Sequence, residues 1–243
     1  MEMTASASIK TVGWIGSAKT DLSSFPEEVK DAIGFALYVA QQGGKHPNAK
    51  PLRGFGGAGI LEIVENHAGD TYRAVYTIRL AGRIYALHAF QKKSKAGTKT
   101  PKSEVDLIKS RLKRAEKEHA RWLEDQKGAT SMTRTSEVEE SSGNVFADIG
   151  LPNPEERLAK ADLAIRIAAA IRARRLTQAR AARILKIDQP KISRLLRGQL
   201  SGFSAERLMH FLTLLGRDVE IVVKRAPRSR RQGHVRVVAT ASR

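Results

Sequence analysis

Residues 176–198 read LTQARAARILKIDQPKISRLLRG and predict two short helices joined by a tight turn. The hydroxyl of Thr177 can cap the first helix, and Leu185 belongs to its apolar face. Asp188 can cap the second helix, whose first turn accepts Pro190 because the N–H that proline lacks has no helical partner there. Apolar residues then return at helical spacing, so the stretch predicts a helix-turn-helix.

The outward face of the second helix is polar and basic. Its side chains can donate hydrogen bonds to base edges and phosphates, and they lie at the helix end that enters a major groove. We predict DNA binding by Thr177, Gln178, Gln189, Lys191, Ser193, Arg194 and Arg197. The alternative is an ordinary helical hairpin with a solvated basic face, which the joint pattern of the stretch disfavours.

The combination of TQ, small Ala, Leu, Ile, QxxIS and Gly in this stretch resembles the phage-repressor (Xre) type of helix-turn-helix. One position departs from that pattern, because Lys186 stands in the turn where the family commonly has Gly. A left-handed residue other than Gly costs on the order of 1 kcal/mol there, which the motif can survive.

The chain is long enough for one large or two small domains, and the helix-turn-helix with its surrounding helices accounts for only the last part. A second domain must therefore fill the front. The formal net charge is +18, with +7 on residues 1–128 (21 basic, 14 acidic) and +11 on 129–243 (22 basic, 11 acidic). Such a balance indicates polyanionic partners, without separating DNA from RNA or from an acidic membrane surface.

Missing residue types exclude several kinds of site. With no cysteine, the chain has no disulfide framework, no thiolate chemistry and no zinc finger. No segment approaches about 18 continuous apolar residues, and the N-terminus lacks a signal-peptide core. We therefore expect a cytoplasmic protein with no membrane partner, and we expect neither a metal nor a cofactor.

The front half begins with a predicted strand and helix. The strand at 9–15 alternates weakly, and the helix that follows has Ser24 and Glu27 at capping-box spacing. Gly43 marks its end. The loop over 50–59 is rich in glycine but matches no phosphate-binding pattern and precedes no helix, so we predict no nucleotide site there.

Three strands follow in close order, at 60–65, 72–80 and 83–91, and predict an antiparallel meander. We expect helix to cover one face of this sheet and functional side chains to occupy the other. A run of lysines then leads into a long helix with apolar positions from Val105 to Trp122.

Short motifs follow one another over 50–114 in the order LRG, ILEI, TYRAVY, GRIYALHAFQKK and KTPKSEVDLIKSRL. This order resembles HigB-type toxins of the RelE/ParE superfamily, most specifically in Tyr72-Arg73 and in the FQKK of 90–93 followed by Thr100-Pro101. The resemblance implies a small twisted antiparallel sheet with helices on one face. It also implies ribosome-dependent cleavage of messenger RNA without a metal.

Cleavage of RNA by its own 2′-hydroxyl requires a proton acceptor, a proton donor and cations that stabilise the phosphorane. The front half has no carboxylate pair or cluster with metal-ligand spacing, whereas Arg73 lies within an apolar sequence, where a charge needs a reason. We predict Arg73, Lys92 and Lys93 as catalytic cations, and Lys50, Arg53, Lys95 and Lys99 as RNA-binding residues. Each lysine alone fits surface solubility as well, and His88 fits a structural histidine better than a catalytic base.

Residues 126–143 are rich in Ser, Thr, Gly and Glu and have no apolar period, which predicts a linker. The linker contains Met132, followed by an acidic stretch at 137–140. From Asn144 onward, NVFADIGLPNPEERLAKADLAIRIAAAIRARRLTQ resembles the HigA-type antitoxins that accompany such toxins, as far as about Val223. The chain thus resembles both members of an operon, toxin first, joined in one polypeptide.

The back half predicts further helices beside the helix-turn-helix. We expect Asn153 to cap a long helix that begins with Pro154, and Ser204 to cap a later helix that Gly216 ends. Residues 218–224 alternate as a strand. An isolated strand needs a partner, most simply the same strand of a second copy.

The predicted fold class is α+β, with a small antiparallel sheet and helices followed by an all-α helix-turn-helix domain and a C-terminal strand. We expect a toxin domain at 1–125, a linker at 126–143, an antitoxin domain at 144–225 and a disordered basic tail at 226–243. Contact between the modules must be local, because both halves are basic. The candidates are the acidic stretch at 137–140 and the apolar Val145, Phe146 and Ile149, laid against the sheet or its neighbouring helix.

Three interpretations stay open. The first is a toxin and antitoxin fusion whose partners are mRNA on the ribosome, operator DNA and its own two modules, with a homodimer formed through the antitoxin half. The second is a transcription regulator whose front domain binds nucleic acid or a partner and catalyses nothing. The third is a concatenation of two neighbouring gene products, which Met132 would allow. The antitoxin could also act by bulk, keeping the toxin out of the ribosome without touching the catalytic cations.

Overall fold

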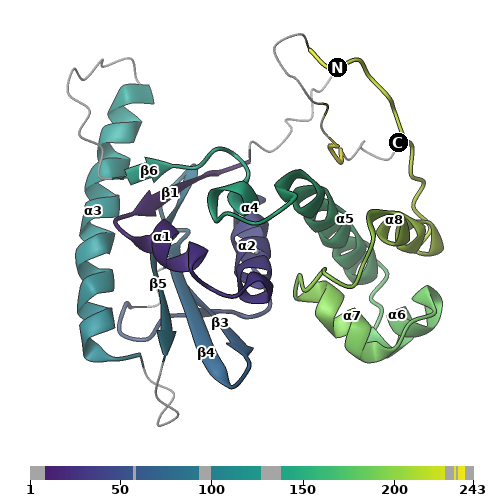
Figure 1. Ribbon diagram of the computed structural model, residues 1–243, viewed down its shortest axis with the longest axis horizontal. Coiled ribbons are helices and arrows are strands. Elements are labelled where there is room, and N and C mark those ends of the chain that lie inside the picture. The colour runs from purple at the N-terminus through teal and green to yellow at the C-terminus, as the bar shows by residue number, and fades with distance from the viewer. Residues whose placement is uncertain are drawn as a thin grey trace. The chain divides into compact units, whose positions relative to one another are not determined.

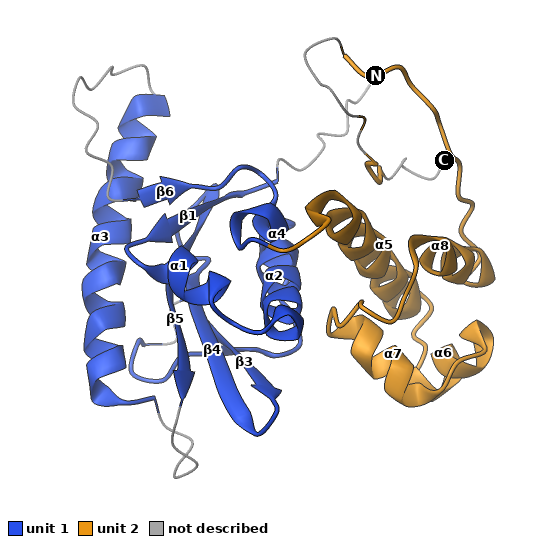
Figure 2. Ribbon diagram, in the orientation of Figure 1, with its two compact units in different colours: residues 1–150 blue, residues 151–243 orange. Residues whose placement is uncertain are grey.

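The computed structural model describes residues 9–56, 59–92, 100–126, 138–227, 233 and 235–238. The chain divides into two compact units, 1–150 and 151–243 (Figure 2). The predicted α+β class is confirmed, because unit 1 contains a sheet with helices and unit 2 contains helices (Figure 1). Among the described residues, no helix is both long enough and apolar enough to cross a membrane.

Unit 1 holds a six-stranded sheet in the order β2-β3-β4-β5-β1-β6. Neighbouring strands are antiparallel, except that β1 and β5 run parallel. The predicted meander is confirmed as β3, β4 and β5, whereas β2 and β6 were not predicted, since three residues are too few to show an alternating pattern. The strands are β1 (Thr11–Ile15), β2 (Ala49–Pro51), β3 (Ile60–His67), β4 (Asp70–Thr77), β5 (Arg83–Lys92) and β6 (Val138–Glu140).

Helices cover both faces of this sheet, so the expectation of helices on one face was wrong. Helix α2 lies on one face with α4 beside it, and α3 lies on the other (Figure 1). Ile108 and Ala115 of α3 pack with Val75, Tyr85 and Phe90 of the sheet. The last six residues of β4 are all buried, and a strand buried on both faces needs cover on both. The helices are α1 (Ala18–Ser23), α2 (Glu27–Gln41), α3 (Lys102–Gln126) and α4 (Val145–Asp148).

The start of α2 differs from its prediction. The residue that precedes α2 is Pro26, and the hydroxyl of Ser24 donates instead to the carbonyl of Asp21 at 2.6 Å. Ser24 therefore ends the short, unpredicted helix α1 and does not open α2. Six residues of α1 are too few to show a helical period.

Unit 2 consists of α5 (Pro154–Ala173), α6 (Gln178–Leu185), α7 (Gln189–Leu196) and α8 (Ala205–Leu214). Helix α5 packs against α7 and α8, and α6 packs against α7. The buried side chains at these contacts include Ile167, Ile192, Leu195, Leu208 and Phe211. The cap predicted at Ser204 is confirmed, because its hydroxyl accepts from the N–H of Arg207 at 3.2 Å.

Two predictions for the back half were wrong. Asn153 takes a left-handed backbone with φ of 50°, and its side chain makes no capping hydrogen bond, although Pro154 begins α5 as expected. Residues 218–224 form no strand, and Ile221 and Val223 are exposed. A strand needs a second strand for its backbone groups, and the helices of unit 2 offer none. The described part of the basic tail contains neither helix nor strand.

Candidate functional sites

The strand register gathers three of the predicted cations on one face of the sheet. Arg73 of β4 is the cross-strand neighbour of Phe90 of β5, and Lys92 lies two residues beyond Phe90. Lys50 of β2 is the neighbour of Glu62 of β3, which shares the face of Arg73. Because alternate residues of a strand point to the same side, Arg73, Lys92 and Lys50 lie on the face that α3 covers.

Arg73 is almost buried and ion-paired. Its side chain is 8% exposed, and its Nη1 lies 2.5 Å from Oε2 of Glu62, which is 15% exposed. The same nitrogen lies 3.3 Å from Oγ1 of Thr100. A carboxylate therefore balances the charge that stood out in the apolar sequence of β4. An anionic substrate that binds Arg73 must therefore either share the guanidinium with Glu62 or displace the Glu62 carboxylate.

The other predicted catalytic and RNA-binding cations divide into those that the structure describes and those that it does not. Lys50 is exposed and Lys92 is half-buried at the end of β5, whereas the exposed Arg53 lies in the turn after β2 and not on a strand. Lys93, Lys95 and Lys99 lie outside the described residues. The structure thus brings Arg73, Lys92 and Lys50 to a common face and leaves Arg53 in the adjoining turn.

His88 lies on the same face and is held at both ring nitrogens. Its Nε2 lies 2.6 Å from Oε2 of Glu104, and its Nδ1 lies 2.9 Å from Nη1 of Arg111. A guanidinium only donates, so Nδ1 accepts and the proton of the neutral ring sits on Nε2, facing the carboxylate. This arrangement supports the structural role that the sequence favours for His88. Among the described residues, no group of three or more His, Cys, Asp or Glu could hold a metal ion.

Arg111 is a buried polar residue that the sequence analysis missed. Its guanidinium also donates to the hydroxyl of Ser17 at 2.6 Å. Burial lowers the pKa of Arg111, while the carboxylates of Asp21 and Glu104 raise it. The available signal was its position, because Arg111 follows Ile108 by three residues on the apolar face of α3.

Residues 138–150, which we call the strap, belong to unit 1 and pack on the rest of it, although the first of them fall within the predicted linker. Strand β6 pairs antiparallel with β1, and the N–H of Ser141 donates to the carbonyl of Val12 at 2.9 Å. Val138 belongs to the core between the sheet and α3. The strap thus extends the sheet beyond β1.

Two acidic side chains of the strap contact the rest of unit 1, as predicted, and each of them meets a basic residue there. Glu140 forms an ion pair with Arg83, whose side chain is 4% exposed. Glu139 lies 2.5 Å from Nζ of Lys19. The Glu140 pair gives the buried cation its carboxylate, whereas the more exposed Glu139 pair contributes little stability.

Asp148 of α4 receives several hydrogen bonds where the strap turns. The indole N–H of Trp14 donates to its Oδ2 at 3.3 Å. The N–H and the hydroxyl of Ser142 donate to its Oδ1 at 2.9 and 2.7 Å. Asp148 therefore joins the strap both to β1 and to itself.

The apolar side chains of the strap lie against α2, also as predicted. Val145, Phe146 and Ile149 are buried. A Cβ placed on Gly34 of α2 would lie 3.1 Å from the ring of Phe146 and 3.2 Å from Ile149. Glycine at position 34 therefore leaves the space that these two side chains fill.

Helices α6 and α7 form the predicted helix-turn-helix. The hydroxyl of Thr177 accepts from the N–H of Arg180 at 3.2 Å, and Asp188 accepts from the N–H of Lys191 at 3.0 Å. The turn residue Lys186 has φ of 53° and ψ of 43°. The left-handed conformation expected at this position is confirmed, with lysine in place of glycine.

The predicted DNA-binding residues differ in their accessibility. Lys191 lies 3.0 Å from Oδ2 of Asp188, and its hydrogen bond lowers the pKa of that carboxyl. Arg197 donates from Nε to the carbonyl of Ser193 at 3.2 Å. Thr177, Gln178, Gln189 and Arg194 are exposed, and Lys191, Ser193 and Arg197 are half-buried. Gln189 and Arg194 are therefore the most accessible groups on the second helix.

Comparisons with known proteins find two families that match the chain one after the other, the first in the sheet-containing part and the second from α4 onward. Residues 20–113 match the family described as "Phage derived protein Gp49-like (DUF891)", and residues 145–224 match the family described as "Helix-turn-helix domain". A solved structure described as "Putative XRE Family Transcriptional Regulator" is 49% identical, covers 37% of this chain and 100% of its own, and has a TM-score of 0.35. No curated protein matches the chain. The helix-turn-helix match begins within the strap, at α4.

Proposed function

Because the chain joins a Gp49-like domain, of a RelE/HigB-type toxin family, to an Xre-type helix-turn-helix domain, we propose that it is a toxin and its antitoxin in one polypeptide. The front module cleaves messenger RNA on the ribosome, and the back module neutralises it and represses their shared promoter. The observation that carries the proposal is the common face of Arg73 and Lys92 within the toxin-type domain. The protein acts in the cytoplasm, where ribosomes and operator DNA are found.

The chemistry of the front module depends on its cations. Attack by the 2′-hydroxyl places negative charge on the phosphate oxygens, and fixed cations in a partly desolvated site stabilise that charge more than cations in water do. The burial of Arg73 and the position of Lys92 on the same face support this role for both residues, with Lys93 as a third cation. Lys50, Arg53, Lys95 and Lys99 hold the RNA backbone.

Glu62 sets a condition on this mechanism. It neutralises Arg73 in the unbound protein, so an incoming phosphate must compete with a carboxylate for the same guanidinium. Arg73 is therefore positioned before the substrate arrives, and little reorganisation is needed at the moment of reaction.

The back module binds operator DNA with α7 in the major groove. The exposure of Gln189 and Arg194 near the start of α7 supports base contacts by both residues. Ile221 and Val223 are apolar and exposed, which supports contact of this segment with a second copy. A dimer of this kind reads a palindrome whose half-sites lie about one or two helical turns apart.

Neutralisation acts by bulk rather than by covering the cations. Strand β6 pairs with residues 13–15 of β1, and β1 pairs with β5 only as far as Ala86. Lys92 lies six residues further along β5, about 20 Å at the usual rise per residue. Strand β6 therefore lies at a distance from these cations, and the bulk that the helix-turn-helix unit adds to the chain excludes the toxin module from the ribosome.

Expression of unit 1 alone, residues 1–150, tests the proposal. We expect growth arrest and cutting of translated RNA, and we expect Arg73→Ala to lower the rate by about 10²–10³-fold, as for the loss of one charge-stabilising group. Arg79→Ala is the matched control, because Arg79 is 43% exposed and pairs with Glu116 on the surface. Its rate should be unchanged.

The rival function is a regulator whose front domain binds nucleic acid without cutting it. A folded unit 1 that leaves translated RNA intact, while the full chain still binds its promoter, would establish that alternative. A folded Arg73→Ala unit that cuts at the original rate would leave the toxin proposal in place but remove Arg73 from its site.

A further inference from the structure

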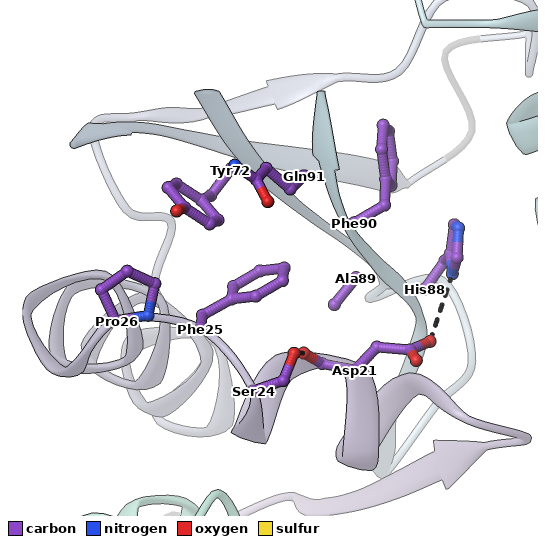
Figure 3. Close-up of a pocket in the computed structure, with 9 residues that line it drawn as sticks. All are labelled: Asp21, Ser24, Phe25, Pro26, Tyr72, His88, Ala89, Phe90 and Gln91. Carbon is purple, nitrogen blue, oxygen red and sulfur yellow. Dashed lines mark hydrogen bonds and ion pairs between the residues drawn. The ribbon is translucent and has the colours of Figure 1, made fainter. Parts of the chain in front are cut away.

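A cavity of about 610 Å³ opens between α1, the start of α2 and β5 (Figure 3). Its volume falls within the usual range for small-ligand sites, roughly 300–1,000 Å³. Strand β1 pairs with β5 only as far as Ala86. After Ala86, this edge of β5 has no neighbouring strand among the described residues. The cavity lies at this edge and is lined there by residues 88–91. The proposed cleavage does not use this cavity.

Aromatic rings form much of its wall. Phe25 and Tyr72 pack edge to face with ring centroids 4.9 Å apart, and Phe90 stacks on His88 at 5.1 Å. Each of these side chains is at most 9% exposed, so neighbouring groups hold the rings in place. Rigid aromatic walls suit a flat, partly apolar ligand, and unpaired bases of single-stranded RNA bind on such surfaces.

Polar groups with spare hydrogen-bonding capacity line the same cavity (Figure 3). Oδ2 of Asp21 accepts from the hydroxyl of Ser17 at 2.7 Å and lies 3.9 Å from Nδ1 of His88. Within the described residues, Oδ1 of Asp21, the amide of Gln91 and the hydroxyl of Tyr72 make no hydrogen bond. A ligand can therefore be recognised by a carboxylate, an amide and a phenol without displacing an existing partner.

We infer that this cavity binds one unpaired base of the RNA and prefers a base that carries an amino group. The inference rests on the proposed function and adds a substrate-reading site to it. The carboxylate of Asp21 repels a phosphate but accepts from the amino group of adenine, cytosine or guanine, which uracil lacks. The amide of Gln91 can both donate to and accept from the edge of the same base.

The position of the cavity fits the cations of the proposed site. Gln91 immediately precedes Lys92, and Tyr72 immediately precedes Arg73. Gln91 and Tyr72 are cross-strand neighbours, as are Phe90 and Arg73. A base in the cavity therefore has its own phosphate within one or two residues of the cations, on the adjoining face of the same two strands.

Binding of short single-stranded oligonucleotides to the full chain tests the inference. The probes are 2′-O-methyl oligo(A), oligo(C) and oligo(U), which cannot be cleaved by their own 2′-hydroxyl, and excess duplex DNA occupies the helix-turn-helix. We expect oligo(A) and oligo(C) to bind about tenfold more tightly than oligo(U), near the lower end of discrimination by one base-edge contact.

Three variants separate base reading from charge. Asp21→Asn and Gln91→Ala should each reduce the preference over oligo(U) to less than about threefold, since each removes one contact to the base. Lys92→Ala should weaken the binding of all three probes alike, because Lys92 contacts phosphate in this proposal. The slope of log affinity against log salt concentration should fall by about one. Circular dichroism and the unfolding temperature must show that each variant is folded.

Equal binding of the three probes to the wild-type chain would overturn the inference, as would an unchanged preference in both folded variants. The outcomes for the two proposals are distinct. Base preference without cutting of translated RNA by unit 1 would support the cavity and refute the nuclease, whereas cutting without base preference would refute the cavity alone.

Discussion

Replacing Phe146 with alanine perturbs the strap without touching the predicted cations. The Phe146 ring is 2% exposed and lies against Gly34 of α2, with its centroid 6.4 Å from that of Tyr38. Truncation removes this packing and leaves a cavity. The strap should then detach from unit 1 more often, while the sheet that carries Arg73 keeps its core.

The magnitude follows from the burial of the ring. Phe→Ala substitutions in well-packed cores cost about 3–5 kcal/mol. Since about 1.4 kcal/mol is a tenfold change in an equilibrium constant, the detached population should rise by roughly 100- to 4,000-fold if the strap opens as one segment. The helix-turn-helix unit then stays joined only through the longer segment that precedes β6.

Hydrogen exchange of the full chain measures this opening directly. The N–H of Ser141, which donates to Val12, should exchange faster by the same factor, together with the N–H groups of β6. If neutralisation depends on the strap, cutting of translated RNA by the full chain should appear in parallel. Gly34→Ala should act in the same direction, because its Cβ meets Phe146 and Ile149 from the other side.

Glu139→Gln is the matched control within the strap. Its ion pair with Lys19 joins side chains that are 59% and 27% exposed, and pairs at the surface contribute about 0–1 kcal/mol. Exchange in this variant should stay near that of the wild-type chain. Unchanged exchange at Ser141 in a folded Phe146→Ala chain would refute the reasoning about packing, and faster exchange with no activity would refute the inhibitory role of the strap.

Three further predictions concern other parts of the chain. Lys186→Gly should raise the stability of unit 2 by up to about 1 kcal/mol in chemical denaturation, because glycine adopts the left-handed turn without strain; a loss of stability would contradict this. Gln189→Ala and Arg194→Ala should each cost about 1–3 kcal/mol in operator binding and relax specificity at one base pair, measured with single-substituted operators. Burial, and then Arg83, lower the pKa of His119 below its ordinary 6.5. The unfolded chain therefore takes up a proton that the folded chain resists, so the unfolding temperature should fall as the pH drops below about 6.5, and less so in His119→Gln.

The sequence predicted the elements whose patterns are long. Strands β3, β4 and β5 and the helices α2, α3 and α5 each show several repeats of their period, so their existence was predictable although the cap of α2 was not. Strands β2 and β6 have three residues each, and their pairing depends on neighbours far away in the chain. A segment without an apolar period at 126–143 was therefore interpreted wholly as linker, although its last residues join the sheet.

The sequence identified Arg73 of the candidate site, because a charged residue stands out among apolar neighbours. It did not reveal which side chains contact Arg73. Arg73 stood out because the residues around it are apolar, and it is buried as expected. Its partner Glu62 lies on another strand, and only the register of β3 against β4 brings the two together. Register is a property of the folded sheet, so local sequence patterns do not reveal such pairs. The contact of Arg111 with His88 was not predictable either, because it joins α3 to β5 and depends on how the helix packs on the sheet.

The strap also explains how two basic halves can remain associated. Residues 1–128 carry +7 and 129–243 carry +11, so the overall charges of the halves repel one another. The strap contributes carboxylates where unit 1 offers partners, with Glu140 on the buried Arg83 and Asp148 on the indole of Trp14. Trp14 is 1% exposed and Asp148 is 8% exposed, and an interaction between buried groups is screened by salt much less than an exposed ion pair. The association should therefore persist at salt concentrations that weaken DNA binding by unit 2, because DNA binding depends on the release of counterions and the strap does not.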